Sequence, residues 1–287
     1  MSGDQQGKTL IVTGTTSGMG RAVALAAASA GFATVATVRD RERAKTLEAD
    51  AESQGTGLDI RFLDVTDHAA VTSVVSAVAR DYGHIDAVVS QAGGIFALGT
   101  AEQVPMDGFR VTMETNFFGN LAVIRAVLPH LRASRGRLIT TTSLNGTIGA
   151  PYNDAYTASK FALEGVMESI APVVARSGVK ATIFEPGPVA TDIMAPRRRE
   201  RLIAPEPVPG SPYPEPWAFL EHAVAHIPAL QSSEEAAKIV VDLLTADDPP
   251  LRVLSSPWAS EYASAKLADT DGSGALKALD EYLRWGD

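Results

Sequence analysis

The sequence predicts a doubly wound α/β fold, in which helices cover both faces of a parallel β-sheet. Short runs of apolar and β-branched residues alternate with helical patterns along most of the 287 residues. Runs such as AVVS at 87–90 and RLIT at 137–140 are almost continuously apolar, which is typical of strands buried on both faces. Because crossovers between parallel strands are right-handed, the helices are expected on both sides of the sheet.

The predicted elements follow one another in a regular order. Seven strands are expected at 9–13, 33–38, 60–64, 85–90, 137–142, 181–184 and 251–254. Helices are expected at 21–30, 41–53, 67–82, 106–133 and 152–176, then after residue 232 and in the tail from residue 258. Ser232 or Ser233 begins the helix after residue 232 with a capping signature, because Glu234 and Glu235 follow in its first turn.

The chain is expected to form one domain over residues 1–287. Its cofactor half covers about 1–143 and its catalytic half about 144–191. Prolines are dense from 196 to 228, and no helical or strand period survives there. A long irregular segment in a compact domain is usually functional or disordered, so residues 192–230 are predicted to form a lid over the substrate. Residues 231–287 are expected to add a helix, a strand and a tail.

Composition excludes several classes of function. The net charge is -9, and an acidic surface repels phosphate backbones, so no nucleic-acid partner is expected. The absence of cysteine excludes disulfides, thiolate zinc sites and cysteine nucleophiles. Residues 1–8 are too polar for a signal peptide, and the apolar stretch at 22–38 is broken by Ser29, Gly31 and Thr34. A cytoplasmic protein without a membrane partner is therefore expected.

A glycine-rich turn, TGTTSGMGR, follows the first predicted strand and opens the first helix. Glycines at such a turn allow positive φ and let the backbone approach a pyrophosphate, which the free N–H groups of the helix N-terminus favour. The spacing departs from the usual G-x-G-x-x-G, so position is the stronger evidence for a dinucleotide, and a plain turn is the alternative. The turn residues expected at the cofactor are Gly14, Thr16, Ser17, Gly18, Met19 and Gly20.

Tyr156 and Lys160 form a candidate catalytic pair in AYTASK. They lie four residues apart on a predicted helix and so share a face. A free tyrosine has a pKa of about 10, and a nearby ammonium is expected to lower the pKa of the Tyr156 phenol. Ser143 ends the fifth strand, and its hydroxyl is expected to hydrogen-bond the substrate oxygen.

A second tyrosine and lysine have the same spacing. Tyr262 and Lys266 lie beyond the last predicted strand, and the residue thirteen positions before Tyr262 is Pro249, which has no hydroxyl. The second pair is therefore predicted to belong to an amphipathic tail helix without catalytic function.

These motifs, in order from the glycine turn to Thr191, resemble the short-chain dehydrogenase/reductase family in its short form. The resemblance implies a Rossmann-type fold and an NADP(H)-preferring ketoreductase similar to hydroxysteroid dehydrogenases. It implies that Asp64 and Val65 contact the adenine, and that Ala92 and Gly93 lie beside its ribose. The family usually has Asn-Asn-Ala-Gly where this chain has SQAG, so Ser90 and Gln91 depart from the pattern.

The resemblance also assigns expected roles at the nicotinamide. Asn116, in TNFFGN, would hold a water that connects Lys160 to solvent, and Lys160 would hydrogen-bond the nicotinamide ribose. Pro186 and Gly187 would lie at the nicotinamide ring. The Val189 backbone and the Thr191 hydroxyl would bind its carboxamide.

The end of the second strand, ATVRD, bears on which dinucleotide is bound. Enzymes of this fold that use NAD usually have an acidic residue there, but this chain has Val38 followed by Arg39. The forked guanidinium of arginine suits the 2′-phosphate of NADP(H), and Ser17 is a second possible donor. NADP(H) is therefore expected. NAD(H) stays open, because a one-residue shift would place Asp40 near the ribose.

The expected substrate is a mostly apolar small molecule with a carbonyl or secondary alcohol. Its predicted pocket consists of Ile95, Phe96, Asn145, Ile148, Tyr152, Met194, Trp217 and Phe219. A non-catalytic dinucleotide-binding regulator and a lyase or isomerase on the same fold are the alternatives. By resemblance, a homo-oligomer, either a dimer or a tetramer, is expected.

Two other features are expected to carry no chemistry. His222 and His226 are four residues apart but lack a third ligand, so no metal site is expected. The basic run RRRER at 197–201 is expected to be a solvated surface, with recognition of an acidic substrate or carrier protein as the alternative.

Overall fold

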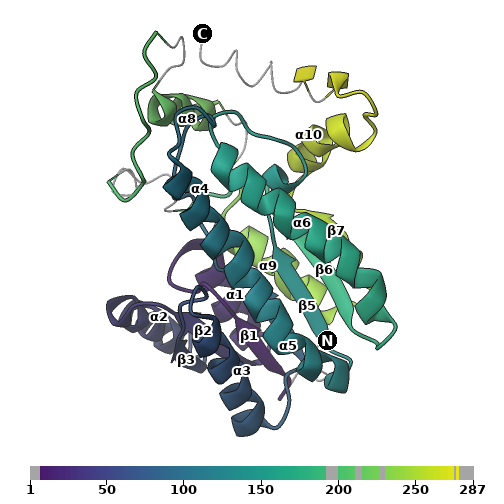
Figure 1. Ribbon diagram of the computed structural model, residues 1–287. Coiled ribbons are helices and arrows are strands. Elements are labelled where there is room, and N and C mark those ends of the chain that lie inside the picture. Colours follow the sequence, from purple (N-terminus) through teal and green to yellow (C-terminus); the bar gives the residue numbers. More distant parts are fainter. Residues whose placement is uncertain (1–6, 192–199, 211–214, 227–229, 275, 278–287) are drawn as a thin grey trace.

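The computed structural model describes residues 7–191, 200–210, 215–226, 230–274 and 276–277. Its centre is a seven-stranded sheet in the order β3-β2-β1-β4-β5-β6-β7, with every pair parallel (Figure 1). The strands are β1 (Thr9–Val12), β2 (Ala33–Val38), β3 (Leu58–Phe62), β4 (Ala87–Ser90), β5 (Arg137–Thr141), β6 (Lys180–Glu185) and β7 (Arg252–Leu254). The order reverses between β1 and β4, which is where ligands bind in sheets of this kind.

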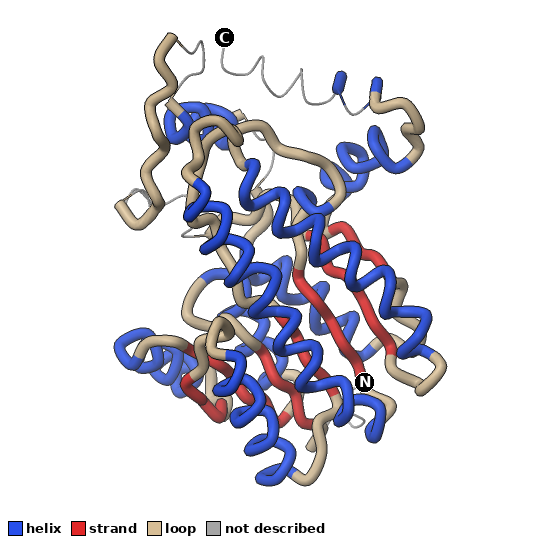
Figure 2. Tube along the Cα trace, viewed as in Figure 1, coloured by secondary structure: helices blue, strands red, loops and turns tan. Residues whose placement is uncertain are grey.

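Helices cover both faces of the sheet, which confirms the predicted fold class (Figures 1 and 2). One face carries α1 (Gly18–Ser29), α2 (Arg41–Ser53) and α9 (Ser233–Thr245), and the other carries α3 (His68–Tyr82), α5 (Asn120–Ser134) and α6 (Asp154–Ala175). Leu10 and Val12 pack into the core on the α1 side, while Ile11 between them packs on the α3 side. The central strands are therefore buried on both faces, as their apolar runs predict.

The expected helix at 106–133 is divided into three parts. They are α4 (Met106–Met113), a π-helical turn at Glu114–Gly119, and α5. A π turn inserts an extra residue into a helix and is frequent at functional sites. Asn116 lies in this turn, where its carbonyl oxygen accepts a hydrogen bond of 2.9 Å from the Asn120 side chain.

The predicted lid at 192–230 is described only in part, and one part is helical. The expectation of an irregular segment is wrong at α8 (Pro216–Ala225). Pro216 does not break the helix because it stands in the first turn, where its missing N–H is not needed. Glu215 caps the helix by accepting a hydrogen bond of 2.9 Å from the Ala218 N–H. Figure 1 places α8, with α10 (Pro257–Leu267), beyond the carboxyl ends of the strands.

Helix α9 begins as the sequence predicts. The Ser232 hydroxyl accepts from the Glu235 N–H at 3.0 Å, and the Ser232 N–H donates to the Glu235 carboxylate at 2.7 Å. This reciprocal cap fixes the start of a helix whose Val240 and Leu244 are fully buried against α1 and the sheet. Several strand ends differ by one or two residues from the expected bounds, since sequence patterns fix the ends of elements less well than their type.

Candidate active site

A cavity of about 1280 Å³ opens at the carboxyl edge of the sheet, beside the switch between β1 and β4. It is lined by the glycine turn, the segments after β2, β4, β5 and β6, and the first turns of α6. Every residue predicted to bind the cofactor lines this one cavity, namely Gly14, Thr16, Ser17, Gly18, Met19, Gly20, Arg39, Asp64, Val65, Ala92, Gly93, Tyr156, Lys160, Pro186, Gly187, Val189 and Thr191.

The glycine turn packs so closely that side chains would not fit. Gly14 has φ +74°, and a Cβ atom there would lie 2.8 Å from the Ala92 Cα. A Cβ atom on Gly20 would lie 2.3 Å from the Gly14 carbonyl oxygen. Ser17 is the N-cap residue of α1, and its side chain makes no capping hydrogen bond. The N-terminus of α1 therefore faces the cavity with the backbone geometry that a pyrophosphate needs.

At Ser90 and Gln91, where the chain departs from the family pattern, the residues after β4 are held by Asn120 and Thr13. The Ser90 hydroxyl donates to Asn120 Oδ1 at 2.7 Å, and Asn120 Nδ2 donates to the Ala92 carbonyl at 2.7 Å. The N–H groups of Gln91 and Ala92 donate to Thr13 Oγ1 at 2.9 and 3.1 Å. The sequence analysis missed Asn120, although it lies four residues after Asn116 and so on the same side of the helix.

Asn116 lies behind the cavity wall. Its Oδ1 accepts from the Gly94 N–H at 2.9 Å, and its Nδ2 donates to the Gly94 carbonyl at 2.9 Å and to Ser159 Oγ at 3.0 Å. The side chain is fully buried and does not line the cavity. These contacts join the loop after β4 to α6, next to Lys160. The expected water-holding role of Asn116 stays a prediction.

Ser143, Tyr156 and Lys160 meet at one wall of the cavity. Ser143 lies two residues after the end of β5, and its hydroxyl accepts from the Asn145 N–H at 3.1 Å while also hydrogen-bonding Tyr156. Lys160 Nζ donates to the Thr141 carbonyl at 3.2 Å and lies 5.5 Å from the centroid of the Tyr156 ring. The carboxyl end of β5 and the start of α6 thus bring together a hydroxyl, a phenol and an ammonium group.

Burial shifts the pKa values of both residues of the candidate pair. Burial lowers the pKa of Lys160 to about 8, although the Glu164 carboxylate opposes the shift. Burial raises the pKa of Tyr156, and its hydrogen bond with Ser143 opposes that shift only in part. The expected lowering of the Tyr156 pKa is therefore wrong for this structure, because desolvation of the phenol is the largest effect on it.

The end of the cavity beyond β2 is rich in arginine. Val38 ends β2 and is buried, and Arg39, the first residue beyond it, lines the cavity 4.0 Å from the Asp64 carboxylate. Asp40 also lines the cavity, but its carboxylate caps α2 by accepting from the Glu42 N–H at 2.8 Å. The same end of the cavity is lined by two arginines that the sequence analysis did not select, Arg21 and Arg43.

Only part of the predicted substrate pocket lies at the cavity. Ile95, Phe96 and Asn145 line it, whereas Ile148 packs into a separate cluster against α10. Phe219, 6% exposed, contacts the Tyr152 ring at 4.4 Å between centroids, and Trp217, 4% exposed, donates to Glu221 at 2.7 Å. Trp217 and Phe219 are buried, Tyr152 is partly exposed, and none of the three lines the cavity. Met194 lies outside the described residues. Apolar lining residues that were not foreseen include Leu202, Val224 and Leu230.

The histidine pair and the basic run were expected to carry no chemistry. Among the residues that the structure describes, no group of three or more metal-ligating side chains is present. His222 and His226 stack with ring centroids 4.2 Å apart. Arg201, the last residue of the basic run, lines the cavity, whereas residues 197–199 lie outside the described part.

In the part of the chain that is described, no helix has the length and apolar character to cross a membrane.

Comparison with known proteins agrees with this arrangement. The sequence model of the family described as short chain dehydrogenase matches residues 8–202. The chain is 32% identical to oxidoreductase BOA17 of Botryotinia fuckeliana over 293 residues, covering 96% of this chain and 97% of that protein. It is 30% identical to human retinol dehydrogenase 8 over 289 residues, covering 96% of this chain and 90% of that protein.

A solved short-chain dehydrogenase from Streptomyces avermitilis has a similar fold. The two structures align with a TM-score of 0.78 and 28% identity, covering 100% of both chains. The matched region of the family model contains the glycine turn, Ser143, Tyr156 and Lys160. The chain belongs to the short-chain dehydrogenase family of oxidoreductases.

Proposed function

We propose that this chain is an NADP(H)-dependent oxidoreductase that transfers a hydride between the nicotinamide and a carbonyl or secondary alcohol. Reduction of a ketone on a mostly apolar molecule is the proposed direction. The observation that carries this proposal is the meeting of Ser143, Tyr156 and Lys160 at the wall of the cavity that the glycine turn also lines. The proposal includes one catalytic domain over residues 1–287, acting as a cytoplasmic homo-oligomer.

The three side chains have separate tasks in the proposed reaction. When bound, NADPH supplies the hydride. The Ser143 hydroxyl hydrogen-bonds the substrate oxygen, and the Tyr156 phenol donates its proton as negative charge develops on that oxygen. The raised pKa of Tyr156 keeps the phenol protonated until then. The ammonium group of Lys160, near the phenol ring, stabilises the phenolate that remains.

The arginine-rich end of the cavity supports NADP(H) rather than NAD(H). Arg39 and Arg43 both line it, and guanidinium groups bind phosphate through paired hydrogen bonds. Val38 offers no carboxylate to a ribose 2′-hydroxyl, and the Asp40 carboxylate is engaged at the start of α2. A 2′-phosphate at this end of the cavity would find compensating positive charge on Arg39 and Arg43.

The lining of the cavity supports an apolar substrate. Ile95, Phe96, Leu202, Val224 and Leu230 contribute apolar surface to the lining of the cavity. The relative retinol dehydrogenase 8 is named for an apolar alcohol, which agrees with this surface. We therefore propose a bulky, mostly hydrocarbon ketone or alcohol as the substrate class.

A turnover assay tests the proposal. The purified protein is incubated with NADPH and a panel of bulky apolar ketones, and the near-ultraviolet absorbance of the reduced nicotinamide is followed. We expect loss of absorbance with at least one ketone and much slower loss with NADH. Tight binding of NADPH without turnover of any ketone would contradict the proposal and favour the non-catalytic regulator.

A further inference from the structure

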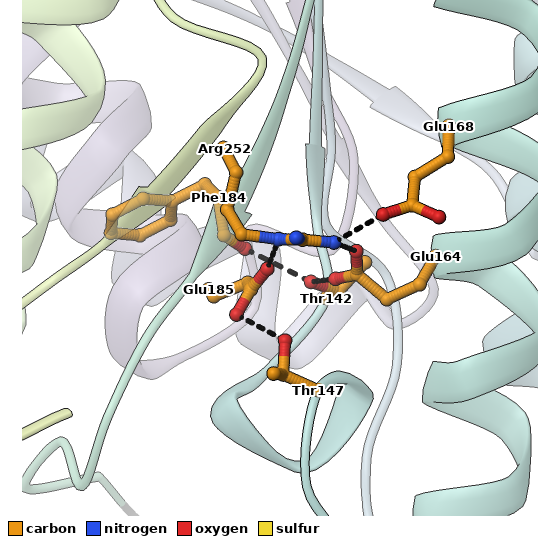
Figure 3. A network of polar contacts seen from close by, with 7 residues as sticks. All are labelled: Thr142, Thr147, Glu164, Glu168, Phe184, Glu185 and Arg252. Carbon is orange, nitrogen blue, oxygen red and sulfur yellow. Dashed lines mark hydrogen bonds and ion pairs between the residues drawn. The ribbon is translucent and has the colours of Figure 1, made fainter. Parts of the chain in front are cut away.

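Arg252 of β7 is the centre of a charged cluster behind the catalytic wall (Figure 3). Its Nε binds the Glu185 carboxylate, and its Nη2 donates to Glu164 at 3.0 Å and to Glu168 at 2.6 Å. Glu185 is 0% exposed and Glu164 is 4% exposed, whereas the Glu168 side chain is 52% exposed. Burying two carboxylates is costly even when they are paired, so packing alone does not account for them.

The two buried carboxylates hold the loop that carries Ser143. Glu164 accepts a hydrogen bond from the Thr142 hydroxyl, one residue before Ser143. Glu185 accepts a hydrogen bond of 2.7 Å from the Thr147 hydroxyl, on the far side of the loop. Figure 3 shows both threonines pointing toward the carboxylates that Arg252 joins. The loop is therefore fixed on both sides of Ser143 by one cluster.

The cluster also reaches Lys160 along α6. Tyr156, Lys160 and Glu164 follow one another at four-residue spacing, so Glu164 lies one turn beyond the ammonium group. The Glu164 carboxylate raises the pKa of Lys160 against the larger effect of burial. The charged or titratable groups around this pair are Tyr156 and Glu168 on α6, Glu185 on β6 and Arg252 on β7.

We propose that Glu164, Glu185 and Arg252 form a positioning cluster that keeps Lys160 in its charged form and holds Ser143 toward the substrate. None of the three lines the cavity, so each acts through another residue. The inference rests on the proposed function, because it assigns the cluster a task in that reaction. Arg252 holds both carboxylates in place, and Glu164 provides the negative charge nearest to Lys160 along the helix.

The first test measures the charge of Lys160 without turnover. The ammonium group is titrated by NMR in wild-type protein, Glu164→Gln and Glu168→Gln, with the signal assigned by its loss in Lys160→Met. We expect Glu164→Gln to lower the midpoint, which is about 8 in wild type, by about half a unit or more, because it removes a nearby opposite charge. Glu168→Gln is the matched control, since Glu168 binds the same Arg252 nitrogen from an exposed position.

The outcomes of this titration distinguish a failure of the cluster proposal from a failure of the proposed function. Equal midpoints in wild type and Glu164→Gln would overturn the role of Glu164. A lowered midpoint in a protein that reduces no ketone would support the charge assignment while the proposed function fails. Glutamine has almost the shape of glutamate, and its carbonyl oxygen can still accept from Thr142, whereas its NH2 group cannot accept from Arg252.

The second test addresses the Ser143 loop with a variant that removes no charged side chain. Thr147→Val removes the hydroxyl that binds Glu185, and we expect kcat to fall about 10-fold with little change in KM for NADPH. The matched control is Thr182→Val, because the Thr182 hydroxyl is equally buried but donates to the Pro250 carbonyl, outside the cluster. Equal kcat values in the two variants would overturn the positioning of Ser143.

Discussion

Two tyrosine–lysine pairs in this chain have the same spacing but different surroundings. Tyr156 and Lys160 begin α6 at the carboxyl edge of the sheet and line the large cavity. Tyr262 and Lys266 lie on α10, and neither lines that cavity. The comparison shows that four-residue spacing on a helix brings two side chains together but does not by itself indicate a catalytic function.

Tyr262 and Lys266 mainly pack against aromatic rings. The Tyr262 ring stacks on Trp258 with centroids 5.2 Å apart and planes 13° from parallel. Lys266 Nζ lies 3.9 Å from the centroid of the Phe161 ring. The first pair has Ser143 beside its phenol and a strand carbonyl at its ammonium. The neighbours supplied by the parallel sheet therefore distinguish the proposed catalytic pair from the second pair.

The largest difference between the pairs is expected on removing the phenol hydroxyl. Tyr156→Phe removes the proposed proton donor, so kcat for ketone reduction should fall about 10³-fold while the fold is retained. Steady-state kinetics with NADPH and a reduced ketone measure the loss, and circular dichroism checks the fold. Turnover near that of wild type would mean that the proton comes from another group.

A smaller loss is expected when the hydroxyl beside Tyr156 is removed. Ser143→Ala deletes a hydrogen-bond donor to the substrate oxygen, which should lower kcat about 10²-fold. The same kinetics and fold check apply. A change confined to KM, with normal kcat, would show that Ser143 binds substrate without stabilising the transition state.

Cofactor preference should change at the end of the cavity away from Tyr156. Arg39→Ala should raise KM for NADPH about 10-fold and KM for NADH little, since only NADPH carries the 2′-phosphate. Arg41→Ala is the control, because Arg41 lies over the Phe62 ring and does not line the cavity. Equal effects of Arg39→Ala on both cofactors would argue against a phosphate contact.

The pH dependence of turnover should report Lys160. Its pKa is lowered to about 8, so Lys160 is protonated below that pH and loses its proton as pH rises through it. Since the charged form is needed, kcat should fall above about pH 8, approaching 10-fold per pH unit. A kcat profile that stays flat well above this pH would contradict the need for the Lys160 charge.

The smallest effect is expected at the second pair. Tyr262→Phe keeps the ring that stacks on Trp258, so kcat should stay within about twofold of wild type. The assay is the one used for Tyr156→Phe, with the two variants measured side by side. A large loss at Tyr262 would mean that the structural pair has been identified wrongly.

The sequence predicts the architecture well because the signals for it are local. Apolar runs in the sequence indicate buried strands. The glycine turn and Ser143 lie within two residues of the ends of their strands, so the sheet brings them to one edge. The cap of α9 is likewise predictable, because Ser232 and Glu235 form it and are only three residues apart. Signals of this kind need no knowledge of distant packing.

Features that depend on long-range packing were not predictable. The prolines around Pro216 obscure the helical pattern of α8 in the sequence. The contact of Phe219 with Tyr152 depends on where that helix packs. The raised pKa of Tyr156 depends on burial, which spacing alone does not reveal. The hydrogen bond between Ser90 and Asn120 spans 30 residues of chain, and it forms only because α5 lies beside β4.

The most direct test of the central claim follows the hydride. NADPH deuterated at both positions of nicotinamide C4 is incubated with the protein and a ketone that it reduces, and the product alcohol is analysed by mass spectrometry and NMR. The account predicts deuterium on the carbinol carbon and a solvent-derived proton on the oxygen, formed much more slowly by Tyr156→Phe than by Tyr262→Phe. An alcohol that carries solvent hydrogen on that carbon, or is formed equally fast by both variants, would contradict it.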